Sequence, residues 1–217
     1  MIVNRFIAPL LTASVVLLSW ALCRGAEWSA PEIRLPTDLK HPAVACTSEE
    51  LARLRAAWKS KGPEHAPVAG EVARADRAMK APLTFPPRGG QHNQWYQCEP
   101  CQMGLKTLDA THHRCPKCGK VYSGEPYDDV LFGRAHETNL RDMTAAAWAW
   151  AITGQAKYAE FAKKVLLGYA ERYATYPYHD SRCRTAKKAS RSGGHLFEQT
   201  LNEASAMTRT IAPACDL

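Results

Sequence analysis

Four cysteines in two Cys-x-x-Cys pairs are the residues of this chain best suited to binding a metal. The pairs are Cys98/Cys101 and Cys115/Cys118. Four thiolates can occupy the corners of a tetrahedron, which is the geometry of zinc in structural sites. In the second pair, Pro116 fixes one backbone angle and Gly119 supplies a left-handed residue, so the backbone can curl its amides toward the sulfurs. The spacing predicts a structural zinc ribbon within residues 91–127, with no open coordination position for catalysis.

Other uses of these residues remain open. In an oxidising compartment the four cysteines could pair as disulfides, although two Cys-x-x-Cys elements at this spacing favour the ribbon. His92, His112 and His113 are close enough in sequence to replace a thiolate. The simpler interpretation is that all three are solvated loop histidines. The sequence also leaves open whether disulfides join the other cysteines of the mature chain, which are Cys46, Cys183 and Cys215.

The first 26 residues have the layout of a secretory signal peptide. Arg5 precedes an almost wholly apolar run, residues 6–22, and polar sequence follows it. Because the apolar run is long for a signal, an uncleaved membrane anchor is the alternative. We expect a periplasmic or secreted protein whose mature chain, residues 27–217, has no stable insertion in a membrane.

The composition indicates one globular domain with a basic surplus. The 217 residues include 28 Lys and Arg against 21 Asp and Glu, which gives a formal charge of +7. A hydrophobic content of 46% argues against disorder. The positive charge favours anionic partners, namely nucleic acid, anionic lipid or acidic polysaccharide. Because an exported chain has little access to nucleic acid, we expect no nucleic acid as partner, and the charge alone leaves acidic polysaccharide and anionic lipid open. The oligomeric state stays open.

Apolar spacing predicts a mainly α fold. The expected helices cover residues 47–60, 64–79, 137–153, 155–173 and a last segment starting near 195. Thr47 and Glu50 fit a capping box at the first helix start. Gly154 leaves a short connection between two helices with broad apolar stripes, so these should form an antiparallel hairpin. The aromatic stripe of residues 155–173 is expected to be core.

Several short stretches occur together in an order typical of one enzyme family. They are His41-Pro42, residues 89–92 leading into 95–98, the 115–119 knuckle running into 122–124, residues 151–154, and residues 197–204. Together they resemble the N-terminal part of the heparinase II/III-like polysaccharide lyases, to which alginate lyases are related. The resemblance implies a partial (α/α) toroid of helical hairpins with the four-cysteine ribbon as an insertion. It also implies β-elimination in a uronic-acid polysaccharide, for which a base removes the C5 proton.

The chain is shorter than members of that family. They carry catalytic Asn, His and Tyr residues on later toroid helices, followed by a β-sheet domain. We therefore expect the 217 residues to be a fragment, with its catalytic residues beyond Leu217 and no lyase turnover of its own. Unsaturated uronate product from the isolated chain would contradict this expectation. The alternative is a non-catalytic, zinc-stapled helical module that binds polyanionic glycans.

The candidate substrate-binding residues lie near the C-terminus. The last helix is expected to present a polar face opposite Phe197 and Leu201, beside the basic loop 181–194. The residues of interest are Arg191, Gln199, Asn202 and Glu203. Ordinary solvent-facing polar residues are the alternative interpretation. Four more residues suit acid–base chemistry by type but lack supporting partners: Tyr176, Tyr178, His179 and His195.

Overall fold

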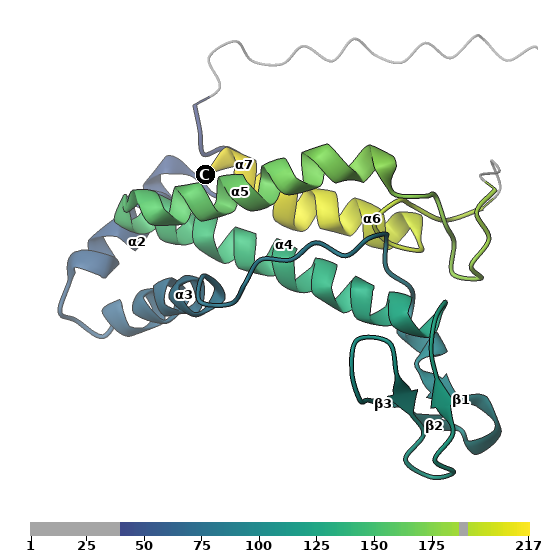
Figure 1. Cartoon of the computed structure of the whole chain (residues 1–217). Helices are drawn as coiled ribbons and strands as arrows, with labels where there is room; N and C mark the ends of the chain where they lie inside the picture. The colour runs from purple at the N-terminus through teal and green to yellow at the C-terminus, as the bar shows by residue number, and fades with distance from the viewer. Residues whose placement is uncertain (1–39, 187–190) are drawn as a thin grey trace, which may run out of the picture. The chain divides into compact units, whose positions relative to one another are not determined.

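The computed structural model describes residues 40–186 and 191–217, which form a mainly helical unit (Figure 1). The predicted signal peptide, residues 1–26, lies outside the described residues, as do Lys187 and Lys188 of the basic loop. Within the described part of the chain, no helix is long and apolar enough to cross a membrane.

The predicted helices are present, with two differences in where they begin. Their bounds are α2 Ser48–Lys59, α3 His65–Ala78, α4 Tyr127–Thr153, α5 Ala156–Arg172, α6 Thr200–Ala206, a π-helical turn η4 at Met207–Ile211, and α7 Ala212–Asp216. The capping box is confirmed, because Thr47 accepts from the Glu50 amide and the Glu50 carboxylate accepts from the Thr47 amide. Gly154 ends α4 with a left-handed φ of 72°, as a C-terminal glycine does.

Helix α4 is the centre of the helical unit. It packs against α5 and also contacts α2, α3 and α7 (Figure 1). Leu140 and Met143 of α4 meet Tyr158, Val165 and Tyr169 of α5 in one buried cluster. The aromatic stripe of α5 is therefore core, as predicted. Burial of such side chains is the main force holding the helices together, at roughly 1.5–3 kcal/mol for each large apolar side chain.

Helix α4 begins at Tyr127, ten residues before the predicted start at Glu137. The first three turns include Asp128, Asp129 and His136, all buried, and these polar residues interrupt the apolar periodicity. Each of them has hydrogen-bond partners in the segments that lie beside the helix. The sequence pattern missed this part of α4 because its buried positions are polar rather than apolar.

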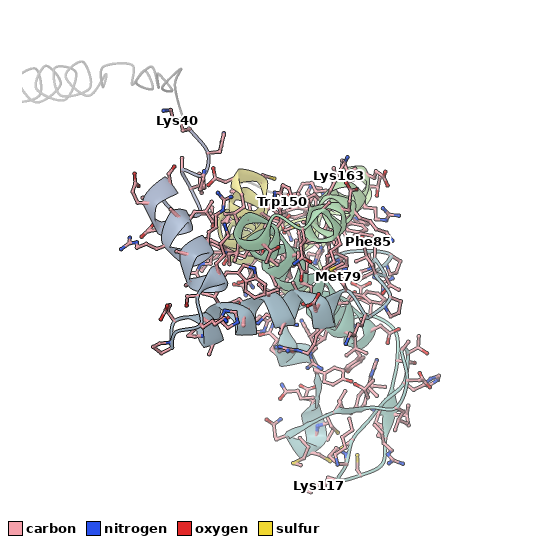
Figure 2. All side chains as sticks on the ribbon, turned by 90° about the vertical axis from the view of Figure 1, so that its left-hand side faces the viewer. Lys40, Met79, Phe85, Lys117, Trp150 and Lys163 are labelled. Atoms are coloured by element: carbon pink, nitrogen blue, oxygen red, sulfur yellow. The ribbon has the colours of Figure 1, made fainter. Side chains whose placement is uncertain are left out.

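The ribbon consists of two small antiparallel sheets. The elements are η1 Asn93–Trp95, β1 Gln97–Cys98, η2 Glu99–Cys101, β2 Met103–Gly104, β3 Lys106–Thr107, β4 His113–Arg114 and β5 Val121–Tyr122. Strands β1 and β2 pair with Cys98 opposite Met103, and β4 is the middle strand of the order β3-β4-β5. Figure 2 shows the ribbon extending away from the helices, with Lys117 at its far tip.

A buried carboxylate at the end of α7 holds the segment that precedes α2. The oxygens of Asp216 accept the amide N–H groups of Ala43, Val44 and Ala45 at 2.8–3.1 Å. The His41 ring nitrogen Nδ1 lies 2.6 Å from the same carboxylate. Burial alone would raise the pKa of Asp216, but the bonds from Ala45, His41 and the other amides outweigh it and hold that pKa well below its usual range.

We expect Asp216→Asn to lower the free energy of unfolding by about 2–3 kcal/mol, because hydrogen bonds to a charged acceptor are lost. The wild-type contribution should be fully present above the unfolded-state pKa of about 3.9 and should fall as the pH drops below it, because the folded-state pKa is depressed. Urea unfolding across acidic pH measures both effects. Glu171→Gln, which alters an exposed carboxylate, is the control and should change stability by under about 0.5 kcal/mol. Equal effects of the two substitutions would contradict the assignment.

Candidate metal centre and the loops beside it

The four ribbon cysteines come together at one point. Their Sγ atoms all lie within 4.8 Å of one another. The first pair sits on β1 and η2, and the second pair sits in the turn between β4 and β5. That turn is closed by the Gly119 amide, which donates to the Cys115 carbonyl at 3.0 Å, with Gly119 at a φ of 77°. The prediction of a four-cysteine cluster is confirmed, and the cluster could bind a metal ion.

The thiols of the cluster differ in acidity. The Tyr122 hydroxyl donates to Cys98 Sγ at 3.1 Å and lowers the pKa of that thiol to about 6. The neighbouring sulfur of Cys118, with burial, raises the pKa of Cys101 to about 12. The Cys98 thiolate is thus favoured, while Cys101 resists ionisation beside it. A bound cation would remove this conflict by stabilising all four thiolates.

His113 is fully buried, so the interpretation of all three ribbon histidines as solvated is wrong for this one. Its Nε2 lies 2.9 Å from Asp128 Oδ1 on α4, and its Nδ1 lies 2.9 Å from the Tyr96 hydroxyl. The same Asp128 oxygen accepts the Gly124 amide. His112 is exposed, and His92 is half-buried as the cap of η1. His113 therefore anchors the ribbon to the first turn of α4 and stands outside the cysteine cluster.

A glycine-containing segment, residues 88–91, lies against α4 and the loop before α6. The Gly90 amide donates to the Leu196 carbonyl at 2.9 Å. A Cβ atom at Gly90 would lie 2.1 Å from the Cα atom of Gly133 on α4, so only glycine fits there. Arg88 at the start of the segment pairs with the buried Asp129 at 2.5 Å. The segment 88–91 thus joins the ribbon side of α4 to the C-terminal loops.

His136 of α4 is buried between segment 88–91 and α5. Its Nε2 lies 2.9 Å from the Arg88 carbonyl oxygen, and its Nδ1 lies 3.0 Å from the Tyr169 hydroxyl. Burial lowers the pKa of His136 to about 4, so the ring is neutral at physiological pH. Burial likewise raises the pKa of Tyr169 well above its usual value. Because His136 and Tyr169 are both buried and hydrogen-bonded, their role is to hold α4, α5 and segment 88–91 together.

Glu203 explains why the last helix begins at Thr200 and not near His195 as expected. The buried carboxylate accepts the backbone amides of His195, Leu196 and Phe197 at 2.8–3.2 Å. It also accepts the Tyr173 hydroxyl at 2.7 Å, and burial together with this carboxylate raises the pKa of Tyr173 to about 12. Residues 195–197 therefore wrap around Glu203 instead of forming a helical turn.

The other predicted binding residues differ in exposure and in their local partners. Asn202 is exposed and donates to the buried Glu198 carboxylate at 2.9 Å. Gln199 is the half-buried N-cap of α6. Arg191 lies in the basic loop, 3.5 Å from the buried Asp180 carboxylate. Arg191 and Asn202 thus contact different buried carboxylates, and substrate binding by these residues stays a prediction.

A cavity of about 240 Å³ lies between α4 and the C-terminal helices. Asn202 lines it together with Glu137, Leu140, Phe197, Ser205, Ala206, Arg209 and Thr210. Arg209, which was not among the predicted binding residues, is an exposed cation in the π-helical turn that follows α6. Its spacing of seven residues from Asn202 was the available signal, because two helical turns bring such positions to one face. We call this site the α4–α6 cavity.

The four residues suited to acid–base chemistry by type are engaged with backbone groups. His195 Nδ1 lies 2.7 Å from the Tyr176 carbonyl, and His179 Nε2 lies 2.6 Å from the Gly90 carbonyl. The Tyr176 hydroxyl donates to the Pro86 carbonyl at 2.8 Å. Tyr178 has a long contact of 3.4 Å to the Arg191 carbonyl. These contacts support the structural interpretation of the four residues.

Comparison with known proteins relates part of this chain to one enzyme. No family model matches the chain. Over 69 residues, which are 32% of the chain, it is 38% identical to an exo-oligoalginate lyase of Saccharophagus degradans. The aligned segment covers 9% of that enzyme's length. The match therefore indicates a relationship to a polysaccharide lyase within that segment.

Proposed function

We propose that this protein is of the polysaccharide-lyase type and binds a uronic-acid-containing polysaccharide. The observation that carries the proposal is the 38% identity over 69 residues to an enzyme named for its action on alginate oligomers. The formal charge of +7 supports it, because a basic protein attracts a polymer that carries a carboxylate on each uronate ring. Nucleic acid is not the proposed partner, since we also propose export to the periplasm or the medium.

The α4–α6 cavity is the proposed contact site for the acidic polymer. Arg209 provides an exposed guanidinium for a uronate carboxylate, and Asn202 provides an amide for hydroxyl groups. Gln199 lies at the start of the same helix. Arg191 is a weaker candidate because Asp180 already compensates its charge. Glu203 acts indirectly in this proposal, since its carboxylate is occupied by the loop 195–197 and fixes the start of α6.

Zinc is the metal that we propose for the cysteine cluster. Four sulfur donors within 4.8 Å of one another fit a tetrahedral zinc ion, whose thiolate bonds are about 2.3 Å long. Thiolate ligands also select zinc over the hard cations calcium and magnesium. With four protein ligands a zinc ion has no position for a substrate, so its proposed role is to hold the ribbon together.

The helical hairpins are proposed to be part of an (α/α) toroid, with residues 91–127 inserted as the ribbon. β-Elimination requires a base at C5 and a group that stabilises the developing negative charge. Among the described residues, His136, His179 and His195 face backbone carbonyls. We therefore propose that this part of the protein binds and positions the polymer. A non-catalytic glycan-binding module, favoured by the same contacts, is the second candidate function.

Titration with oligoalginate, followed by calorimetry and by the absorbance of unsaturated product, tests the proposal. Arg209→Ala should weaken binding about five- to tenfold through loss of a charge-assisted hydrogen bond. Lys163→Ala, which removes an equal charge from α5 (Figure 2), is the matched control and should leave binding nearly unchanged. Binding without product supports the positioning role. If both variants bind as the wild type does, or if the wild type does not bind, the proposed site is wrong.

A further inference from the structure

A second small cleft lies where the ribbon meets the start of α4. Its volume is about 250 Å³, and it is lined by Gln94, Trp95, Gln97, Glu99 and Tyr127. These residues come from η1, β1, η2 and the first turn of α4. We call it the ribbon cleft. It is smaller than the roughly 300–1,000 Å³ of a site for a drug-sized ligand, so its size suits a single ring.

The aromatic part of the ribbon cleft is held in place. The Trp95 indole Nε1 donates to the Ser181 carbonyl at 2.9 Å, and the Gln94 side-chain amide donates to the same oxygen at 3.2 Å. The Tyr127 ring packs against Tyr122 with centroids 4.8 Å apart. Both aromatic rings are half-buried and so keep part of their surface open. Rings that are fixed before binding lose little conformational entropy when a ligand arrives.

The rim of the ribbon cleft carries polar groups that are free to bind. Gln97 and Glu99 are exposed, and their side chains have no hydrogen-bond partner among residues 40–186 and 191–217. The Tyr127 hydroxyl also has none within that part of the chain. An amide offers a donor and an acceptor, a carboxylate offers acceptors, and a phenol can do either. This set matches the hydroxyl groups of a sugar.

We propose that the ribbon cleft binds one pyranose ring of the polysaccharide through its apolar C–H face and its hydroxyl groups. The C–H face would lie on Trp95 and Tyr127, because aromatic side chains combine a large apolar surface with a polar edge. The Glu99 carboxylate would accept hydroxyl hydrogens from a ring whose own carboxylate points away from Glu99, because like charges repel at close range. Recognition here therefore differs from the charge-based contact proposed for the α4–α6 cavity. The inference rests on the proposed function in taking the ligand to be a polysaccharide.

NMR titration of the zinc-loaded chain with mannuronate trisaccharide and with neutral mannotriose tests this inference. Both sugars should shift the Trp95 indole signal, and added salt should leave the effect of mannotriose unchanged, because no charge attraction is involved. Trp95→Ala should weaken mannotriose binding about three- to tenfold. Since Trp95 also holds the loop at Ser181, Gln97→Ala provides a second variant without a structural bond and should weaken binding about threefold.

The outcomes separate the two proposals. Shifts at Trp95 and Gln97 support the ribbon cleft whether or not Asn202 responds. If the acidic trisaccharide shifts only the NMR signals of Asn202 and Arg209, the proposal for the ribbon cleft is wrong and the proposed function is still supported. If neither sugar shifts any of these signals at millimolar concentration, both the cleft and the proposed function are wrong.

Discussion

Replacing Cys115 by serine should abolish tight metal binding and unfold the ribbon. Cys115 is buried within the cluster, and its sulfur lies within 4.8 Å of the other three. The ribbon strands are only two residues long, so we expect a metal bound by the four cysteines to supply most of their stability. Structural zinc contributes roughly 10–16 kcal/mol in small zinc-bound domains. We expect zinc affinity to fall by more than about 100-fold, since even changes beside a metal ligand cost about 10–100-fold.

The effect should reach α4, because His113 joins β4 to Asp128 in the first turn of that helix. Hydrogen exchange of residues 127–133 should therefore become faster in the Cys115→Ser protein, and chelation of zinc from the wild type should have the same effect. Cys215→Ser changes an exposed thiol outside the cluster and is the matched control. Unchanged zinc affinity, or unchanged exchange in α4 after chelation, would contradict this coupling.

Gly90→Ala should destabilise the helical unit by about 3 kcal/mol, at the upper end of the cost of overpacking. The new Cβ would lie 2.1 Å from Gly133 Cα and 2.4 Å from Gly133 N. Both are backbone atoms, so no rotamer change can make room, and segment 88–91 would have to move away from α4. The displaced segment would also lose the bond from the Gly90 amide to the Leu196 carbonyl.

Gly70→Ala is the control for that substitution. Gly70 is exposed within α3, and a Cβ there would meet nothing within 4 Å. This change should stabilise the protein by about 0.4–1 kcal/mol, because alanine restricts the unfolded chain in a helix-compatible conformation. Urea unfolding of the zinc-loaded proteins measures both effects. A Gly90→Ala protein as stable as the wild type would show that the close approach of segment 88–91 to α4 is wrong.

The sequence was sufficient to predict structural features whose signal lies within a few neighbouring residues. Three such predictions are confirmed by the structure: the capping box at Thr47, the helix end at Gly154 and the apolar stripe of α5. Each depends only on residues within one or two helical turns of one another. The cysteine cluster was also predictable, since the Cys-x-x-Cys spacing brings each pair of sulfurs together within a single turn.

The sequence was insufficient where a buried polar residue has a distant partner. Asp128 pairs with His113, and Asp216 binds the segment 43–45 at the other end of the described chain. Neither pairing has a periodic signature, so the first turns of α4 and the burial of His113 were missed. Glu203 looked like part of an exposed polar face for the same reason, although its carboxylate holds the loop 195–197.

The most direct test of the proposed function compares two ligands of the zinc-loaded chain, oligomannuronate and a neutral mannose oligomer of equal length. The affinity of each is measured at low and at high salt. We predict that the acidic oligomer binds more tightly at low salt and that high salt removes this advantage, because exposed charges such as Arg209 are screened. Equal affinity for the two oligomers at low salt, or no binding of the acidic one, would contradict the account.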